Sequence, residues 1–306
     1  MPPPALFGTR RWQRRTGDSA PVLLRGGTCV LTGAASGIGE ALAHGLAARS
    51  SHLVLVDRDP ERLESVAGEI RASHPKLGVA TYVVDLADAD AATDVAETIR
   101  RETPRITLLV NNAGVALGGR FDQVTPEEFD WVMNVNLRAP VLLTHYLLPA
   151  LKKSPGSHIV NVSSLFGLIA PAGQAAYSSS KFAVRGFSEA LRHELVPGGI
   201  GVTTVHPGGV RTRIAETARA GSGTSSESRR AQKEEFDRLL TFPPDRAAEI
   251  ILDAIYHRKG RVLIGTSAVL PDIAARIFPG SYTKALAILT EALGRLPSKP
   301  PGKPRG

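Results

Sequence analysis

Short runs of apolar, mostly β-branched residues alternate along this chain with longer stretches in which apolar positions recur at helical spacing. The short runs show no in–out alternation of apolar and polar residues, which is typical of strands covered on both faces. The pattern predicts strands at Cys29–Thr32, Leu53–Asp57, Val79–Val84, Thr107–Val110, His158–Val162, Gly201–Val205 and Arg261–Ile264. It predicts helices over residues 38–49, 60–73, 90–102, 126–152, 176–196 and 245–258.

This β–α–β alternation predicts an α/β fold, because right-handed crossovers join such elements into a doubly wound parallel sheet with helices on both faces. We expect about seven strands in one domain over residues 27–265. Sheets of this kind bind ligands beyond the carboxyl ends of their strands. Residues that bind a ligand or act in catalysis are therefore expected where each predicted strand ends.

Two segments depart from the alternation. Residues 211–243 contain a polar stretch at 215–235 that is too long for an ordinary connection. It is a candidate substrate lid, with a disordered insertion as the alternative. Residues 266–296 carry apolar residues at one-faced helical spacing, which predicts an amphipathic helical extension. We expect the extension to pack on the body or on a second subunit, and the alternative is weak contact with a membrane surface.

The composition fits one soluble globular unit, with 306 residues of which 42% are hydrophobic and 22% charged. The net charge of +8 sits in the tails. Residues 1–26 hold five arginines against one aspartate, residues 295–306 hold four basic residues and no acid, and the stretch between is neutral. We interpret 1–26 as a flexible basic tail and 297–306 as a disordered one. A basic groove for nucleic acid is not expected.

No run of apolar residues is long enough to span a membrane, and the N-terminus lacks the apolar core of a secretory signal. The single cysteine, Cys29, excludes a disulfide framework and a thiolate metal cluster. We therefore expect a cytoplasmic protein without a metal site, peripheral to a membrane if the extension binds one. An arginine-rich transit peptide is a minor alternative.

The first predicted strand runs into Thr32-Gly-Ala-Ala-Ser-Gly-Ile-Gly39, followed by a helix. Glycines at 33, 37 and 39 permit a tight turn and a close approach of the backbone to a pyrophosphate at the helix N-terminus. Asp57 ends the second strand, where a carboxylate can accept hydrogen bonds from an adenosine ribose. Together these features indicate dinucleotide binding.

Tyr177 and Lys181 begin another predicted helix. Positions i and i+4 share a helix face, so the phenol and the ammonium can address one ligand. A nearby cation favours the phenolate and is expected to lower the pKa of the phenol toward a range useful for acid–base catalysis.

In these residues and their order, residues 27–265 resemble the classical short-chain dehydrogenases/reductases. The resemblance implies a Rossmann-like sheet and a catalytic tetrad of Asn136, Ser164, Tyr177 and Lys181. Ser164, thirteen residues before Tyr177, has the family's usual separation, and Ser163 should face the other way because side chains alternate along a strand. Spacing likewise favours Asn136 over Asn134.

The resemblance also implies the cofactor contacts. They comprise the glycine turn, the ribose acid with its neighbour, an adenine contact, the Asn-Asn-Ala-Gly segment, two tetrad members and the Pro-Gly-Gly-Val-Arg-Thr segment. The residues are Gly33, Ser36, Gly37, Ile38, Gly39, Asp57, Arg58, Asp85, Leu86, Asn112, Ala113, Gly114, Tyr177, Lys181, Pro207, Gly208, Val210 and Thr212.

The function implied is an NAD(P)-dependent oxidoreductase that interconverts an alcohol and a ketone or aldehyde. Asp57 would repel the 2′-phosphate of NADP, so NAD is the expected cofactor, with NADP as the alternative because Arg58 could grip that phosphate. Apolar neighbours suggest an apolar substrate, although they could equally be core: Val115, Leu117, Leu165, Phe166, Leu168 and Ile169. Members of this family are commonly dimeric or tetrameric, so the resemblance implies a homodimer or homotetramer. The alternatives from other classes are a non-catalytic redox sensor and a membrane-surface interaction protein.

Overall fold

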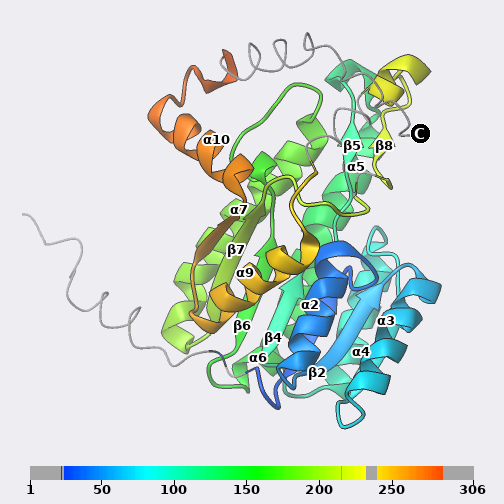
Figure 1. The fold of residues 1–306 in the computed structure, drawn as a ribbon, viewed down its shortest axis with the longest axis vertical. Coiled ribbons are helices and arrows are strands. Elements are labelled where there is room, and N and C mark those ends of the chain that lie inside the picture. Colours follow the sequence, from blue (N-terminus) through cyan, green and yellow to red (C-terminus); the bar gives the residue numbers. More distant parts are fainter. Residues whose placement is uncertain (1–21, 23, 215, 232–239, 285–306) are drawn as a thin grey trace, which may run out of the picture.

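The computed structural model of the protein describes residues 22, 24–214, 216–231 and 240–284. A single parallel sheet forms its centre, with the strand order β3-β2-β1-β4-β6-β7-β9 (Figure 1). The strands are β1 (Thr28–Thr32), β2 (His52–Asp57), β3 (Val79–Val83), β4 (Leu108–Asn111), β6 (His158–Val162), β7 (Gly201–Pro207) and β9 (Arg261–Ile264). All seven predicted strands are present, and the doubly wound parallel sheet is confirmed.

Helices cover both faces of this sheet. One apolar core lies between the sheet and the helices α2 (Gly37–Ala48), α3 (Pro60–Ser73) and α9 (Pro244–Tyr256). A second core lies between the opposite face and the helices α4 (Ala89–Glu102), α6 (Ala139–Lys152) and α7 (Ala175–Leu195). Cys29 and Leu31 of β1 enter the first core and Val30 enters the second, which explains why the strand is apolar at successive positions.

The edge strand β3 departs from the expectation of burial on both faces. Val83 is 59% exposed, and none of the five residues of β3 is fully buried. The reason is its place in the sheet, because β3 pairs with β2 alone among the described strands and lies at one end of the order.

The helix predicted over residues 126–152 is interrupted. It consists of α5 (Pro126–Met133), a π-helical turn at Asn134–Arg138, and α6. Thr125 and Glu128 form a capping box at the start of α5, as their spacing would suggest. Single π turns inside α-helices occur frequently at functional sites, and this one contains Asn136.

A small second sheet was not expected from the sequence. It pairs β5 (Leu117–Gly118) with β8 (Arg219–Ala220), which belongs to the segment 211–243. The guanidinium of Arg219 lies over the Trp131 ring, 3.9 Å from its centroid, and the Glu128 carboxylate accepts a hydrogen bond from Ser222 N. The described part of this segment is therefore attached to α5, and its role as a lid stays a prediction.

Both chain ends of the described region touch the body. Val22 and Leu24, within the segment interpreted as a tail, are buried beside the first core. After β9, helix α10 (Thr266–Ile277) packs against the body through Ala268 and Asp272. The predicted remainder of the extension, residues 285–296, lies outside the described residues, as do residues 1–21, 23 and 297–306.

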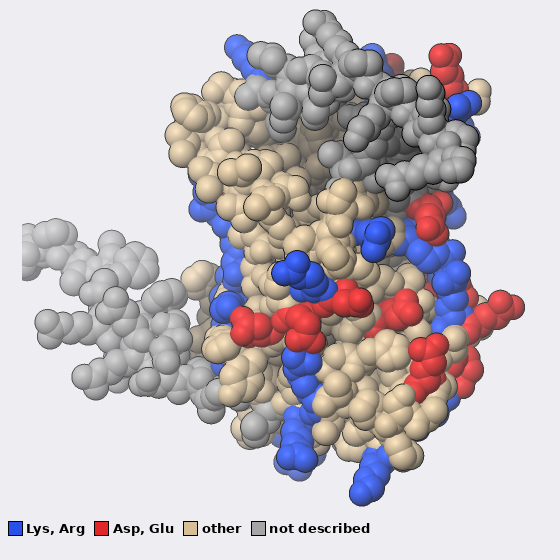
Figure 2. Space-filling model, in the orientation of Figure 1, with Lys and Arg blue, Asp and Glu red and all other residues tan. Residues whose placement is uncertain are grey.

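The other face of α10 is apolar and exposed, and this part of the surface carries few charges in the space-filling view (Figure 2). Leu270, Ile277 and Phe278 are each more than half exposed. None of the described helices is long and apolar enough to cross a bilayer. Contact of the extension with a membrane surface stays a prediction.

Candidate active site

The site lies beyond the carboxyl ends of the central strands, where the order of the sheet reverses between β1 and β4. Gly33 and Gly37 of the first turn have positive φ angles of 67° and 59°. A Cβ on Gly39 would lie 1.9 Å from the Gly33 carbonyl oxygen, and one on Gly33 would lie 2.8 Å from Ala113 Cα. These glycines are required by the turn's own packing, as well as by any ligand that approaches it.

The N-terminus of α2 points into this site. Ser36 precedes the helix, and its side chain makes no capping hydrogen bond to the first turn. The N–H groups of the first helical residues, which have no partner within a helix, are thus available to an anion, and the helix dipole favours one.

Asp57 closes β2, and its carboxylate accepts three backbone N–H groups. Oδ2 accepts from Ala35 N of the glycine turn at 3.0 Å, while Oδ1 accepts from Arg58 N at 2.7 Å and Asp59 N at 3.2 Å. A carboxylate offers about four lone-pair sites, so Oδ2 retains room for one more donor. The carboxylate is fixed in direction and suits a ribose hydroxyl.

The Asn-Asn-Ala-Gly segment ties β4 to the glycine turn. The Thr32 hydroxyl accepts from Asn112 N at 3.1 Å and Ala113 N at 3.0 Å, and Asn112 Nδ2 donates to the Thr32 and Gly33 carbonyls. Asn111 points the other way, where its amide donates to Asn161 Oδ1 at 2.8 Å inside the sheet. Thr32 was not singled out from the sequence, although its place before Gly33 was a usable signal.

The two adjacent serines diverge after β6. Ser163 is buried, and its hydroxyl donates to the Lys181 carbonyl at 2.8 Å. The Ser164 hydroxyl, which is partly exposed, accepts from Phe166 N at 3.1 Å and lies close enough to Tyr177 to act on the pKa of its phenol in the lowering direction. The structure therefore places Ser164, and not Ser163, beside the tyrosine, as strand alternation predicted.

Tyr177 lies on α7 and is only 7% exposed. Burial, the largest cause, raises the pKa of its phenol, while the hydrogen bond with Ser164 acts in the lowering direction. In this geometry burial outweighs the lowering contact, and Lys181 is not among the causes of the shift, so its effect on the pKa of Tyr177 stays a prediction.

Lys181 is buried one turn further along α7. Its Nζ donates to the Val162 carbonyl at 3.1 Å and lies 5.7 Å from the centre of the Tyr177 ring. Burial lowers the pKa of Lys181 to about 8. An ammonium with one backbone acceptor has further N–H donors to offer, which suits it to a ligand hydroxyl.

Asn136 is held in the π turn by three hydrogen bonds. Its Oδ1 accepts from Val115 N at 2.8 Å, and its Nδ2 donates to the Val115 carbonyl and to Ser180 Oγ. A Cβ on Gly114 would lie 3.3 Å from both Asn136 Oδ1 and Lys181 Nζ. Asn136, Lys181 and the Asn-Asn-Ala-Gly segment thus meet at one point, and Ser180 is a contact that the sequence did not reveal.

The loop after β7 closes the site on its other side. Gly208 N donates to the Ile264 carbonyl, and Val210 forms a β-bridge with Phe242. A Cβ on Gly37 would lie 2.9 Å from Thr212 Cγ2, so this loop touches the glycine turn directly. Asp85 and Leu86 follow β3, where the Asp85 carboxylate accepts from Ala87 N at 3.0 Å.

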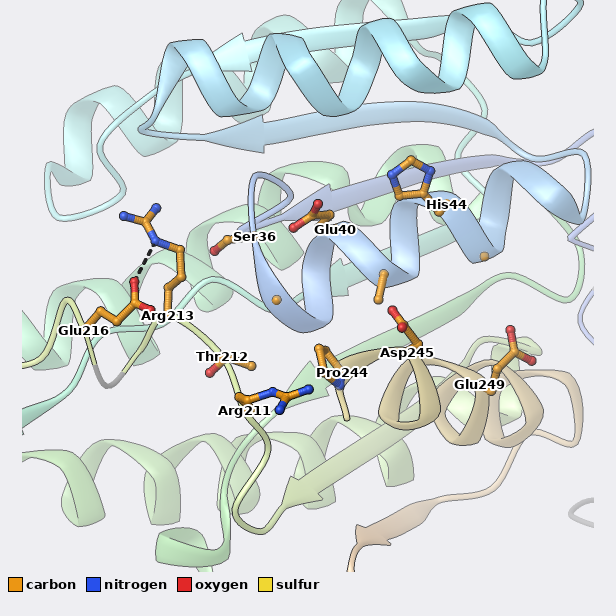
Figure 3. A pocket seen from close by; sticks show the side chains of 13 residues that line it. Ser36, Glu40, His44, Arg211, Thr212, Arg213, Glu216, Pro244, Asp245 and Glu249 are labelled. Carbon is orange, nitrogen blue, oxygen red and sulfur yellow. Dashed lines mark hydrogen bonds and ion pairs between the residues drawn. The ribbon is translucent and has the colours of Figure 1, made fainter. Parts of the chain in front are cut away.

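A cavity of about 670 Å³ adjoins the glycine turn, between α2, residues 211–213 and 216, and the start of α9 (Figure 3). Arg213 reaches into this region, where its Nε bonds to Glu216 at 3.2 Å and its Nη1 lies 3.8 Å from the Asp59 carboxylate. Arg213, which lies beside the loop that follows Asp57, is therefore already paired with two carboxylates.

These observations fit a dinucleotide. The glycine turn has no side chains at positions 33, 37 and 39 to hinder a close approach, the α2 N-terminus offers N–H groups, and Asp57 Oδ2 has a free acceptor position. The sequence-predicted catalytic residues Asn136, Ser164, Tyr177 and Lys181 lie at the other end of the same site. Among the described residues, no cluster of His, Cys, Asp and Glu could hold a metal ion.

Comparison with known proteins agrees with this geometry. A family model described as short chain dehydrogenase matches residues 28–223. SadH of Mycobacterium tuberculosis, a protein named as an oxidoreductase, is 37% identical over 265 residues, which cover 86% of this chain and 94% of SadH. Dehydrogenase/reductase SDR family member 7B of Xenopus laevis is 33% identical, with 82% of this chain and 77% of the relative covered.

Solved structures are similar across nearly the whole chain. A short chain dehydrogenase/reductase from Burkholderia phymatum in complex with NAD has a TM-score of 0.73 at 26% identity, covering 92% of this chain and 99% of that one. A short-chain dehydrogenase from Sphingobium yanoikuyae in complex with NADPH has a TM-score of 0.68 at 28% identity, with the same coverage. The two neighbours bind different cofactors.

Proposed function

The chain belongs to the short-chain dehydrogenase family, and we propose that it interconverts an apolar secondary alcohol and its ketone, or a primary alcohol and its aldehyde. The protein is an oxidoreductase that acts on CH–OH groups with NAD(P). The observation that carries the finer proposal is the placement of Ser164 beside Tyr177 and the buried Lys181, next to a glycine turn and the uncapped N-terminus of α2.

In this proposal Tyr177 exchanges a proton with the substrate oxygen, as the base in alcohol oxidation and the acid in carbonyl reduction. Bound NAD(P) supplies the hydride chemistry. Ser164 donates a hydrogen bond to the substrate oxygen and stabilises the charge that develops there. A phenol whose pKa is raised by burial holds its proton firmly, so a charged neighbour is needed to make the phenolate accessible.

Lys181 is that neighbour. Its ammonium favours the phenolate of Tyr177 and binds the hydroxyls of the nicotinamide ribose. Asn136 holds Val115 and Ser180 in place at the π turn and anchors a water that continues the proton path from Lys181. The role of each residue follows the family resemblance, and the contacts described above support it.

We further propose NAD as the preferred cofactor. Asp57 is fixed toward the ribose position by three backbone donors, and a second carboxylate, Asp59, lies two residues on. Both would repel a 2′-phosphate. Arg213 is engaged by Asp59 and Glu216, which leaves Arg58 as the nearest candidate to bind the phosphate of NADP.

The apolar class of the substrate rests on two side chains. Leu165 and Phe166 are partly exposed beside the serine, and Phe166 packs edge-on against the Tyr177 ring at 6.0 Å. The other apolar residues near the motifs, including Val115 and Leu168, are buried and serve the core. In this proposal Leu165 and Phe166 form an apolar surface next to the substrate oxygen that reacts.

The test is an absorbance assay of nicotinamide oxidation or reduction with apolar alcohols and ketones, including sterol-like, retinoid-like and long-chain compounds, and with both cofactors. For the best substrate, Ser164→Ala should lower kcat about 10²-fold, the scale of a lost oxyanion donor. Ser163→Ala is the matched control and should keep most activity. Absence of turnover on every compound, or equal effects of the two serine variants, would contradict the proposal.

A further inference from the structure

His206 lies directly behind Ser164, at the end of β7. It is fully buried, with 0% of its surface exposed. Its Nδ1 lies 3.0 Å from the Ser164 carbonyl oxygen. A carbonyl can only accept a hydrogen bond, so Nδ1 carries the proton and donates to it.

The other ring nitrogen of His206 has no partner. Nε2 is buried and makes no hydrogen bond to any of the described residues. Burial is the largest cause that lowers the pKa of His206 to about 4, so the ring is neutral near pH 7. An unpaired buried acceptor is costly, typically about 1–3 kcal/mol. An apolar residue would fill the position without this cost. Packing alone therefore does not explain a histidine at this position.

The hydrogen bond that His206 donates to the backbone of Ser164 explains the histidine. The pairing of β6 with β7 ends at Val162 opposite Val205, followed by the hydrogen bond from Ser163 N to the Val205 carbonyl. Ser164 is the next residue and adopts an extended conformation at the start of the turn Leu165–Gly167. Its carbonyl accepts from Gly167 N and from His206 Nδ1. The side chain of His206 thus continues the link to β7 where the strand pairing stops.

We propose that His206 is a positioning residue, whose Nδ1–H donor fixes the Ser164 peptide and thereby aims the Ser164 hydroxyl at Tyr177. This inference rests on the function proposed above for Ser164. Only two rotatable bonds separate the Ser164 carbonyl group, which His206 binds, from the Ser164 hydroxyl. The hydrogen bond that this hydroxyl accepts from Phe166 N also depends on the conformation of the same turn. Without the Nδ1 donor, the turn that begins at Ser164 can shift. The Ser164 hydroxyl is then no longer held in its orientation toward Tyr177.

Two variants separate the donor from the packing of the ring. Asparagine places an amide N–H near the position of Nδ1, whereas leucine fills similar space without a donor. We expect His206→Leu to lower kcat about 10-fold or more, since small displacements of reacting groups cost up to about 10²-fold. The KM for the cofactor should stay within about two-fold of the wild-type value, because the hydrogen bond that is lost goes to Ser164, which is not among the expected cofactor contacts. His206→Asn should retain kcat within about three-fold.

A second readout does not need a substrate. The hydrogen bond from Ser164 lowers the pKa of Tyr177, so a misplaced serine raises that pKa further. The ultraviolet titration of the phenolate, taken as the difference from the same protein with Tyr177→Phe, follows this group alone. It should move upward in His206→Leu and in Ser164→Ala, and remain at the wild-type position in His206→Asn.

The outcomes distinguish the two proposals. If no compound is turned over, or if Ser164→Ala is fully active, the proposed function fails, and the titration of Tyr177 still decides the role of His206. If His206→Leu leaves both kcat and the Tyr177 titration unchanged, the positioning role is wrong. Equal losses in the leucine and asparagine variants would also overturn it, because they would assign the effect to packing. Melting temperatures of all variants identify any change that is only a loss of stability.

Discussion

The phenol of Tyr177 is buried, with its ring edge-on to Phe166, and Ser164 lies close enough to act on its pKa. Burial protects the site from water but raises the pKa of the group that must give and take a proton. Ser164 acts on this pKa in the lowering direction, and the same effect is proposed for the Lys181 ammonium, whose Nζ lies 5.7 Å from the centre of the ring.

Replacing Tyr177 by phenylalanine removes the transferable proton and keeps most of the packing. We expect kcat to fall by about 10²-fold or more, the scale of general acid–base catalysis, with nearly unchanged cofactor affinity. Steady-state kinetics and cofactor titration by fluorescence measure the two quantities. Tyr146→Phe on α6 serves as the control, and activity of Tyr177→Phe within a few-fold of wild type would remove this residue from the mechanism.

Cofactor choice is decided at Asp57. Asp57→Ala removes the charge that faces a 2′-phosphate, so the ratio of kcat/KM for NAD over NADP should fall toward one or below. Asp57→Ser keeps a hydroxyl acceptor for the ribose without the charge and should retain more activity with NAD. A wild-type kcat/KM that is at least as high with NADP, or an unchanged ratio in Asp57→Ala, would show that Asp57 does not set the preference.

At the scale of elements, the segment 211–243 is joined to the body at named points. Arg219 stacks on Trp131, β8 pairs with β5, and Ser222 N donates to Glu128 Oε1 at 2.9 Å. These contacts hold one side of the segment against α5, while its beginning crosses the glycine turn through Thr212. A segment that contacts both the glycine turn and α5 is suited to respond to ligands.

We predict that cofactor and substrate together slow the cleavage of 211–243 by trypsin, because closure over a bound ligand orders a lid. Mass spectrometry of the fragments gives the rate at each arginine. Trp131→Ala removes the platform for Arg219 and should speed cleavage in the free protein. Equal rates with and without ligands would mean that the segment does not act as a lid.

For the whole molecule, a buried histidine on β6 links the fold to pH. His158 is fully buried, and its Nε2 lies 2.7 Å from Thr203 Oγ1, whose hydroxyl donates to the Lys259 carbonyl. Nε2 therefore carries the proton of a neutral ring. Burial, with smaller contributions from Arg258 and Arg192, lowers the pKa of His158 to about 3.

Because this pKa is depressed in the folded state, the unfolded chain binds the proton first as the pH falls. Stability should be intact above the ordinary histidine pKa and decline between about pH 6.5 and 3, by at most about 1.4 kcal/mol per pH unit for this group. Urea unfolding at a series of pH values measures the slope. His158→Gln keeps an N–H donor for Thr203 and should flatten it, whereas the exposed His145→Gln should not. The same slope in both variants would exclude His158 as a cause.

Much of the fold was predictable because its signals are local. Each strand that crosses the centre of the sheet is an apolar run such as Leu53–Asp57, and the glycine turn and the Tyr177–Lys181 pair are read from residues within one or two helical turns. The edge exposure of β3 was not predictable from its own residues, since it depends on which strand has a neighbour on only one side.

What the sequence alone determined are the elements, their order and the residue types at the strand ends, because backbone conformation and amphipathic spacing are set by near neighbours. Only the tertiary structure decided how those types combine. The hydrogen bond from Ser163 to the Lys181 carbonyl, those of Asn136 with Val115 and Ser180, and the one that His206 donates to the Ser164 carbonyl all join residues far apart in the chain. The burial that shifts the pKa values of Tyr177 and Lys181 likewise exists only once distant elements pack together.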